Sequence, residues 1–491
     1  MLSVRIENLR LVIYSLFLLL TCSNLLALPW YDEAAVLENL SSSSWQPYPS
    51  SFNWLQVIPP GYFLIGKLIV NFGIPWVCLR LISALAVIFG LEIILRRLSR
   101  FPNSIYSIVF IAITLFNPLT IQYAQSVKHY TISLPLAATS FILQRHAFRK
   151  RLFLAVLSFL FSPICLLLIA LVALVNLKRD RQIIVCNFLV IGFSLSLLYI
   201  SSILVGFETQ LQMRQEWQLN NISFRDAIGN AAHFVSWFGL LPNLYSFSLY
   251  KFIALLSLVL ILVFVGSQIS KKVTLQISLY LISLALMHFM ALAPLTGRLH
   301  YGFGILLIFF FFESLSRLSS TRVMLRDYAA SLLFLSITFH NVLTAPIDYW
   351  GGFKNNLSVP LSGQSKSYLA HWDIWAGPYI KFYSETSSSI VDVSRSPLVY
   401  DSVSNKINIF CLQEIVQAGD SITLFGLSET ERDELKGTLN VLDVSSKSFL
   451  HAITFKVTEN MNHLLDSTPI PTSPWYCSKF FANPGTPPRE R

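Results

Sequence analysis

The sequence predicts an all-α polytopic membrane protein with a small α/β domain at its C-terminal end. Of its 491 residues, 54% are hydrophobic and 13% are charged, whereas about 25% of residues are charged in a typical soluble domain. Apolar runs of roughly 17 residues or more recur between Leu11 and Leu343, and each can cross a hydrocarbon core of about 30 Å. Beyond residue 345 the chain becomes polar and serine-rich, which indicates a separate folding unit.

The change in composition predicts two domains. Residues 1–345 form the multi-span domain, whose first outer loop covers residues 29–75, and residues 346–491 form the second domain. A domain of the latter size can bury a modest core of its own. Apolar alternation predicts strands in it, with a short helix at 429–436. The expected strands lie at 396–410, Ser421–Leu427 and 449–457.

The basic residues predict how the chain crosses the membrane. The net charge is +10, yet Lys and Arg are dispersed in short loops between apolar runs. That is the pattern of the positive-inside rule and not of a stripe that binds nucleic acid. Arg5 and Arg10 precede the first apolar run, so we expect a cytoplasmic N-terminus and a retained signal anchor. About eleven spans then leave residues 346–491 on the extracytoplasmic side.

Residues 57–72 are apolar but do not fit a simple span. If they crossed the membrane, the next span would deliver Arg96, Arg97 and Arg100 to the outer side, against the positive-inside rule. We therefore expect a juxtamembrane or re-entrant helix that begins at Pro59-Pro60 and lies under the outer leaflet.

Residues 152–175 raise the same conflict, because basic clusters flank this apolar run on both sides. The run is interrupted at Ser162-Pro163, where proline removes a helix hydrogen bond. This break predicts a hairpin of two half-helices with both ends cytoplasmic. One continuous span is the alternative.

Few ionisable residues remain on the outer face when the chain is arranged in this way. Asp32 and Glu33 form an acidic pair in the first outer loop. Such a pair beside a span is costly unless it meets water or serves a site. Cations on this face run against the orientation rule and suit an anionic lipid headgroup. Those expected to bind a phosphate are Lys128, Arg298, Arg80 and Lys67.

This set of residues fits group transfer with a general base. A carboxylate beside an acceptor hydroxyl can take its proton while a phosphate leaves from a sugar, and Lys or Arg stabilises the charge on that phosphate. Asp32 is the expected base, and Glu33 is expected to orient a partner or a divalent cation, Mg²⁺ or Mn²⁺. The alternative is that the pair caps the surface helix expected at 32–40, because acids favour helix N-termini. The sequence contains no metal-binding motif.

Aromatic and histidine side chains border the same loops. The tyrosines either contact a sugar or isoprenoid chain or serve as aromatic-belt residues at the membrane interface. Snorkelling to the interface is the alternative for Lys128, and hydrogen bonds to nearby backbone carbonyls are the alternative for Arg80. The residues expected to contact substrate are Tyr62, Tyr123, Tyr130, His129 and His300.

Five motifs in order give the chain a resemblance to a known superfamily. After the acidic pair comes a Pro-Pro-aromatic helix start, Pro59-Pro60-Gly61-Tyr62-Phe63. An Arg-Leu-x-Ser-Ala-Leu-Ala segment begins at Arg80, a Tyr-x-Gln-x-x-Lys-x-Tyr segment begins at Tyr123, and a Gly-Arg turn lies at Gly297-Arg298. This series, within residues 10–345, resembles the C-type (GT-C) membrane glycosyltransferases, which include protein O-mannosyltransferases and aminoarabinose transferases. Each motif alone is weak, and the shared order carries the resemblance.

The resemblance implies a polyprenyl-phosphate-linked sugar donor, an inverting transfer and a location in a bacterial plasma (inner) membrane. The acceptor is a lipid, a glycan or a protein. In one respect the chain departs from aminoarabinose transferases, which carry an acid-Lys pair directly before Pro-Pro, where this chain has Val57-Ile58. The phosphate contact of aminoarabinose transferases therefore cannot be assigned to the same position here, and Lys67, Lys128 or Arg298 is expected to replace it.

Two other classes of protein remain open. A transporter or flippase of a lipid-linked or anionic substrate needs a polar path through the bilayer midplane, whereas ionisable residues here lie mostly at span ends. A non-catalytic membrane scaffold would depend on the second domain. Cys411 and Cys477 lie in that domain and can pair if it is extracytoplasmic; two free thiols are the alternative.

Overall fold

The computed structural model divides the chain into two compact units. The first comprises residues 1–26, 44–51 and 57–347, and the second comprises residues 27–43, 52–56 and 348–491. Within them the structure describes residues 2–23, 25, 31–41, 58–97, 105–143, 148–177, 180–205, 256, 260–261, 263–289, 299–318, 331–333 and 335–337, together with seven strands between 367 and 456. The described residues do not include Arg298, Cys411, Cys477 or the helix expected at 429–436.

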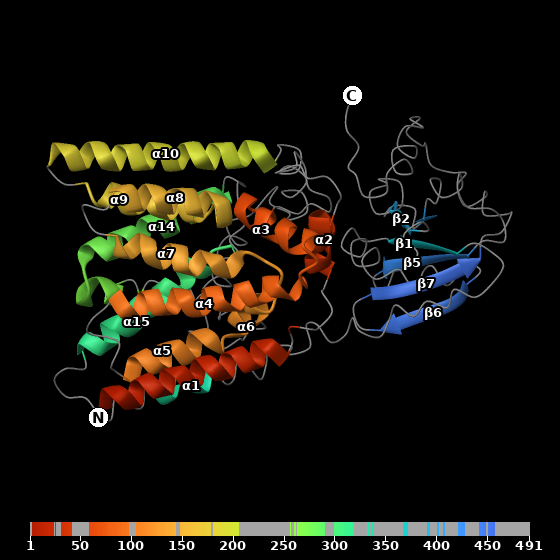
Figure 1. Cartoon of the computed structure of the whole chain (residues 1–491), viewed down its shortest axis with the longest axis horizontal. Helices are drawn as coiled ribbons and strands as arrows, with labels where there is room; N and C mark the ends of the chain where they lie inside the picture. Colours follow the sequence, from red (N-terminus) through yellow and green to blue (C-terminus); the bar gives the residue numbers. More distant parts are fainter. Residues whose placement is uncertain are drawn as a thin grey trace. The chain divides into compact units, whose positions relative to one another are not determined.

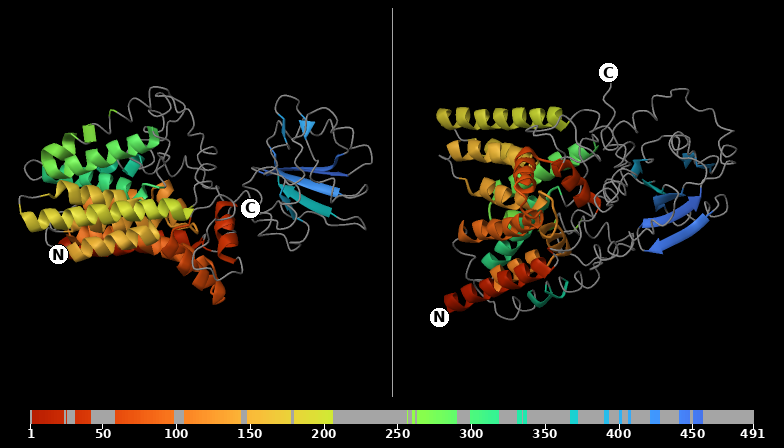
Figure 2. Two further views of the ribbon diagram at one scale, coloured as in Figure 1. Left: turned by 90° about the horizontal axis from the view of Figure 1, so that it is seen from above. Right: turned by 45° about the vertical axis from the view of Figure 1, so that its right-hand side comes forward.

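The first unit is a bundle of helices that lie side by side, with α10 and α1 at opposite edges (Figures 1 and 2). The helix α3 is tilted relative to the others (Figure 1). The described helices are α1 (Leu2–Ser23), α3 (Pro60–Asn71), α4 (Val77–Arg97), α5 (Ile105–Leu115), α6 (Pro118–Ala124), η2 (Tyr130–Ile132), α7 (Ser133–Ile142), α8 (Phe148–Phe161), α9 (Cys165–Val175), α10 (Arg181–Val205), α14 (Lys271–Phe289) and α15 (Tyr301–Leu318).

The side chains of this bundle are arranged as expected in lipid. Large apolar residues point outward from its edge helices, such as Leu16 of α1, Phe188 and Tyr199 of α10, and Ile282 of α14. Small hydroxyl residues are buried between helices, and small residues let membrane helices approach closely. An apolar outer surface of this extent marks contact with a membrane or a partner. The buried hydroxyl residues include Ser83, Ser107, Thr114, Ser140, Ser158 and Ser194.

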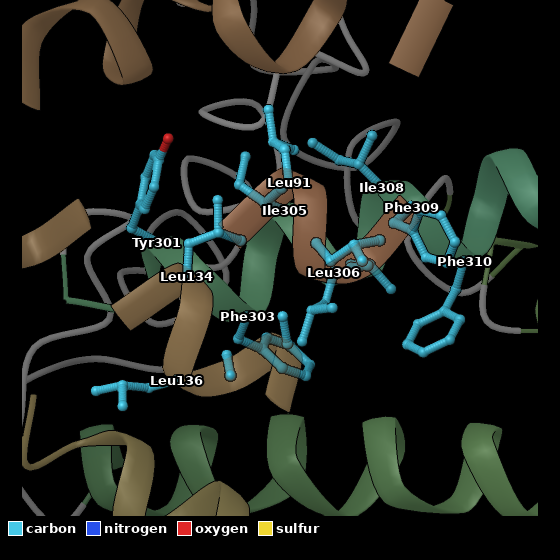
Figure 3. Close-up of a cluster of buried hydrophobic side chains, with 14 of the residues drawn as sticks. Leu91, Leu134, Leu136, Tyr301, Phe303, Ile305, Leu306, Ile308, Phe309 and Phe310 are labelled. Atoms are coloured by element: carbon cyan, nitrogen blue, oxygen red, sulfur yellow. The ribbon is translucent and has the colours of Figure 1, made fainter. Parts of the chain in front are cut away.

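The centre of the bundle is α15. Its residues from Phe303 to Phe309 are all buried, as expected for a stretch of helix that is apolar on every side. Leu91 of α4 and Leu134 of α7 pack in the same cluster (Figure 3). Phe309 packs edge-on against Phe110 of α5, with ring centroids 5.2 Å apart. This core sets the position of the α15 N-terminus, which borders the site described below.

Two of the described helices are long and apolar enough to cross a membrane, over Val77–Arg96 and Arg181–Ser201. Shorter apolar helices lie at Tyr106–Leu115, Tyr130–Ile142 and Cys165–Val175. The apolar stretch at 105–121 is divided into α5 and α6, because Asn117 caps a new helix whose first residue is Pro118. Proline favours this first helical position and disrupts a helix interior.

A hairpin forms where Ser162-Pro163 interrupts the run at 152–175. The guanidinium of Arg151, in the first turn of α8, donates to the Asn187 side chain at 2.6 Å. The Asn187 amide in turn donates to the Asn176 carbonyl, directly after α9, at 3.3 Å. The start of α8 and the end of α9 therefore lie at one end of the bundle, and the chain reverses at the proline.

Hydrogen bonds between helices show which helix ends lie together, and they define two ends of the bundle. The Tyr14 hydroxyl of α1 donates to Glu92 near one end of α4, and Arg80 near the other end of α4 donates to the Leu25 carbonyl after α1. The Glu92 end also holds the last turn of α15, where Arg317 donates to the Gln268 carbonyl before α14. We call it the basic end, because it carries Arg96, Arg151, Arg181, Lys271, Lys272 and Arg317.

The second unit contains α2 (Tyr31–Ser41) and two small sheets. The larger sheet has the order β2-β1-β5-β7-β6; β2, β1 and β5 are parallel, and β7 is antiparallel to both β5 and β6. The strands are β1 (Ser367–His371), β2 (Ile390–Asp392), β3 (Tyr400–Asp401), β4 (Lys406–Ile407), β5 (Ser421–Leu427), β6 (Val441–Lys447) and β7 (Leu450–Lys456).

The strand expected at Ser421–Leu427 is confirmed as β5, and the one at 449–457 is confirmed as β7. The expected strand at 396–410 contains the short strands β3 and β4, which pair with each other. The strands β1, β2 and β6 were not predicted. The strand β2 has only three residues, and β6 is interrupted by polar residues, so the apolar alternation of both is weak.

We predict that Gly302→Ala destabilises the bundle by about 1–3 kcal/mol. A β-carbon at Gly302 would lie 2.7 Å from the Leu134 backbone nitrogen and closer still to the Ser133 carbonyl, so α15 would have to move away from α7. The measurement is the thermal unfolding midpoint in detergent.

Gly192→Ala is the matched control, because a β-carbon there meets nothing within 4 Å. Alanine is the better helix former by about 1 kcal/mol, so this variant should be neutral or more stable. Equal midpoints for the two variants would show that α15 and α7 do not pack this closely.

Candidate functional site

Four of the residues expected to contact substrate form one row of rings at the end of the bundle opposite the basic end. The rings of Tyr62 and His129 lie 6.1 Å apart, centroid to centroid. His129 and Tyr130 are 4.8 Å apart, and Tyr130 packs edge-on against Tyr123 at 5.2 Å. The row therefore brings α3, the segment after α6 and α6 itself into contact.

Two lysines are buried in the same part of the fold. Lys128, directly before His129, is 4% exposed, and Lys67 on α3 is 3% exposed. Burial lowers the pKa of the Lys67 ammonium group, because removing a charge from water disfavours the charged form. The structure thus places both expected phosphate-binding lysines inside the folded bundle.

The segment between α6 and α7 presents Lys128, His129 and Tyr130. It is not an α-helix, so its backbone carbonyls need partners from elsewhere. The Ser83 hydroxyl of α4 lies 3.1 Å from the Ser126 carbonyl oxygen and 2.9 Å from that of Lys128. The Ser133 hydroxyl donates to the Tyr130 carbonyl at 2.6 Å.

Arg80 makes contacts within the protein. Its guanidinium donates to the Leu25 carbonyl at 2.9 Å and lies 4.7 Å from the centroid of the Trp76 ring. The first contact is the alternative expected for this residue, a hydrogen bond to a backbone carbonyl. Arg80 therefore ties α4 to the chain that leaves α1 toward α2. A phosphate contact by Arg80 stays a prediction.

The start of α15 lies against the segment that carries Tyr130. The Tyr301 hydroxyl donates to Thr120 at 2.9 Å, and the Gly302 N–H donates to the Ser133 hydroxyl at 2.9 Å. His300 is buried, with its Nδ1 3.2 Å from the Tyr280 hydroxyl. Its expected contact with substrate stays a prediction.

The acidic pair lies on α2, whose predicted position at 32–40 is confirmed. Glu33 is 1% exposed and shares a buried face with Val36, Leu37 and Leu40, since these positions recur every three to four residues. The Asp32 side chain lies outside the described residues. Because α2 belongs to the second unit, the meeting of the acidic pair with the cations stays a prediction.

Among the side chains that the structure describes, no group of three or more His, Cys, Asp and Glu residues could hold a metal ion. The expected site for Mg²⁺ or Mn²⁺ would involve Asp32, whose side chain lies outside the described residues. The divalent cation therefore stays an untested alternative.

No protein-family model matches the sequence, and a search of curated proteins finds no match. The structure is similar to the crystal structure of ArnT from Cupriavidus metallidurans in the apo state, with a TM-score of 0.51. The likeness covers 90% of this chain and 97% of ArnT at 11% sequence identity. The fold is GT-C-like. At this identity the likeness concerns the fold alone.

The residues that hold the site together were not among those predicted for it. Ser83 occurs inside a motif that marks the resemblance, but only the structure gives it partners on the Lys128 segment. Gly302 carries no signal of its own, because small residues are common in apolar helices. A search for hydroxyl residues next to a non-helical interruption would have found Ser133.

We predict that Arg80→Ala lowers the free energy of unfolding by about 1.5–3 kcal/mol, the range for a hydrogen bond to a charged group. The variant loses both the bond to Leu25 and the contact with Trp76. The measurement is the unfolding midpoint of purified protein without added lipid substrate.

Arg96→Ala on the same helix is the control. Its ion pair with Glu92 involves a side chain that is 80% exposed, and such pairs contribute about 0–1 kcal/mol. If Arg80→Ala is no less stable than Arg96→Ala, the contact between Arg80 and Leu25 does not hold α4 to α1.

Proposed function

We propose that this protein is a membrane glycosyltransferase that moves a sugar from a polyprenyl-phosphate-linked donor to an acceptor on the extracytoplasmic face, with inversion at the anomeric carbon. The GT-C-like fold over nine-tenths of the chain supports an enzyme of this type. The observation that carries the proposal is the row of Tyr62, His129, Tyr130 and Tyr123 beside buried Lys128.

The distribution of charge supports the proposed sidedness. The basic clusters gather at one end of the bundle, whereas Lys128 and the aromatic row lie at the other. Under the positive-inside rule the basic end faces the cytoplasm. The site then opens to the extracytoplasmic side of a plasma (inner) membrane, where residues 346–491 are also expected.

The proposed reaction is a single displacement. The acceptor hydroxyl oxygen attacks the anomeric carbon as the bond between that carbon and the phosphate oxygen breaks. The Asp32 carboxylate takes the hydroxyl proton as general base, and polyprenyl phosphate leaves as an anion. Lys128 stabilises the charge on the leaving phosphate, with Arg298, Lys67 and Arg80 as further candidate cations. Glu33 orients a partner of the base.

The aromatic row suits the rest of such a donor. Tyrosine combines an apolar ring with a polar hydroxyl group, so it can contact a sugar face or the first isoprene units at a membrane interface. Tyr62, Tyr123, Tyr130 and His129 are proposed for these contacts, and His300 for a contact at the border of the site. The donor class itself comes from the resemblance in the sequence.

The described part of the chain favours an enzyme over a transporter. Buried polar residues within its helices are mostly serine and threonine, such as Thr114, Ser140 and Ser194. Most of its charged side chains lie within two turns of a helix end or in connections. A transporter of an anionic substrate would require ionisable groups near the bilayer midplane.

We predict that Asp32→Asn abolishes sugar transfer without loss of folded protein, because an amide cannot accept the acceptor proton. The measurement is release of polyprenyl phosphate from polyprenyl-phosphate-linked hexose and pentose donors, followed by mass spectrometry.

The control for this variant is Asp180→Asn, which changes an acid whose side chain accepts from the Gln182 N–H at the start of α10. Unchanged transfer by Asp32→Asn would defeat the assignment of the base. A protein that acts only as a scaffold would tolerate this change but fail when residues 346–491 are deleted.

We predict that Lys128→Ala and Arg298→Ala chiefly raise the donor KM, by about 10- to 100-fold, as expected for the loss of a charge-assisted hydrogen bond. Lys271→Ala, at the basic end, should leave the donor KM unchanged. Normal saturation by donor in either variant would remove that residue from the phosphate site.

A further inference from the structure

We infer that Ser83 is a positioning residue that sets the place of Lys128 and His129, with Ser133 holding the other end of the same segment. The inference deepens the proposed function, on which it rests for its binding readout. Neither serine is proposed to touch a substrate.

The first step is the covalent geometry of the contact. The carbonyl that Ser83 meets at 2.9 Å belongs to Lys128, and this carbonyl shares a rigid peptide plane with the N–H of His129. Fixing that oxygen therefore restricts the backbone on both sides, from which the Lys128 ammonium group and the His129 ring project. The second contact, to Ser126 at 3.1 Å, holds the residue two positions earlier.

The second step is that Ser83 itself has little freedom. It is 0% exposed and lies one turn after Arg80, which ties α4 to the Leu25 carbonyl. Its neighbour Ala84 is also buried in the core. A hydroxyl group on a buried, rigid helix fixes the position of its hydrogen-bond partner more precisely than one on a loop does.

The third step is the far end of the segment. Ser133 donates to the Tyr130 carbonyl at 2.6 Å and accepts from the Gly302 N–H at 2.9 Å. The Ile132 N–H also donates to the His129 carbonyl at 3.1 Å. Residues 126–133 are thus attached to α4 at one end and to α15 at the other, and the ring of His129 between them meets Tyr62.

The test uses the full-length protein in lipid nanodiscs, with undecaprenyl phosphate as the probe and native mass spectrometry to measure binding. Ser83→Ala should bind the probe about five- to tenfold more weakly, the effect of losing one hydrogen bond. Ser140→Ala is the matched control, since Ser140 is equally buried but its hydroxyl donates to Ala137 within its own helix. This control should bind as the unaltered protein does.

A double-mutant cycle separates positioning from general stability. If Ser83 acts through Lys128, Ser83→Ala combined with Lys128→Ala should bind no more weakly than Lys128→Ala alone. Additive losses would overturn the positioning of Lys128 by Ser83, because they would mean that Ser83 acts through other residues.

Hydrogen exchange of the backbone amides gives a readout that does not depend on the proposed function. Amides 126–130 should exchange faster in Ser83→Ala, and amides 130–132 faster in Ser133→Ala, while α10 is unchanged. If the unaltered protein does not bind the probe, the proposed function fails but faster exchange still supports the positioning role. Unchanged exchange overturns that role whether or not the probe binds.

Discussion

The constraint on which the site depends is that backbone polar groups inside a membrane protein must find partners within the protein. The stretch from α6 to α7 breaks helical hydrogen bonding at the end of a bundle. Its carbonyls at Ser126, Lys128 and Tyr130 are met by two serine hydroxyl groups, Ser83 and Ser133. The break is tolerated because those hydroxyls are present, and it allows a lysine and two rings to project together.

The same bundle is organised by an asymmetry of charge. Basic residues collect at one end, where Arg96 and Arg317 pair with acids one turn earlier and Arg151 bonds to Asn187. At the other end the cations Arg80 and Lys128 are buried, and the Arg80 guanidinium lies 4.7 Å from the centroid of the Trp76 ring. Under the proposed sidedness, the positive-inside rule places the basic end in the cytoplasm, so the same asymmetry would decide which end meets an extracytoplasmic acceptor.

Local patterns predicted much of the fold and some of the site. The juxtamembrane helix within the first outer loop begins at Pro60 as expected, because proline suits a first helical turn, and the hairpin follows from Ser162-Pro163. The sequence predicted only a shared membrane face for the aromatic row of Tyr62, His129, Tyr130 and Tyr123. Their contact as one row depends on how α3 tilts against α8, where Gly61 leaves room for Leu160 and Phe161. No local pattern encodes such an angle.

By itself the sequence determined the membrane class of the protein, the apolar helices, the order of the motifs and the basic clusters from which sidedness is predicted. These are properties of composition and spacing along one chain. Only the tertiary structure decided that Arg80 bonds to Leu25, that Gly302 lets α15 reach Ser133, and that Ser83 meets the Lys128 carbonyl. Each of these joins residues at least 45 positions apart, and such contacts depend on close packing of whole helices.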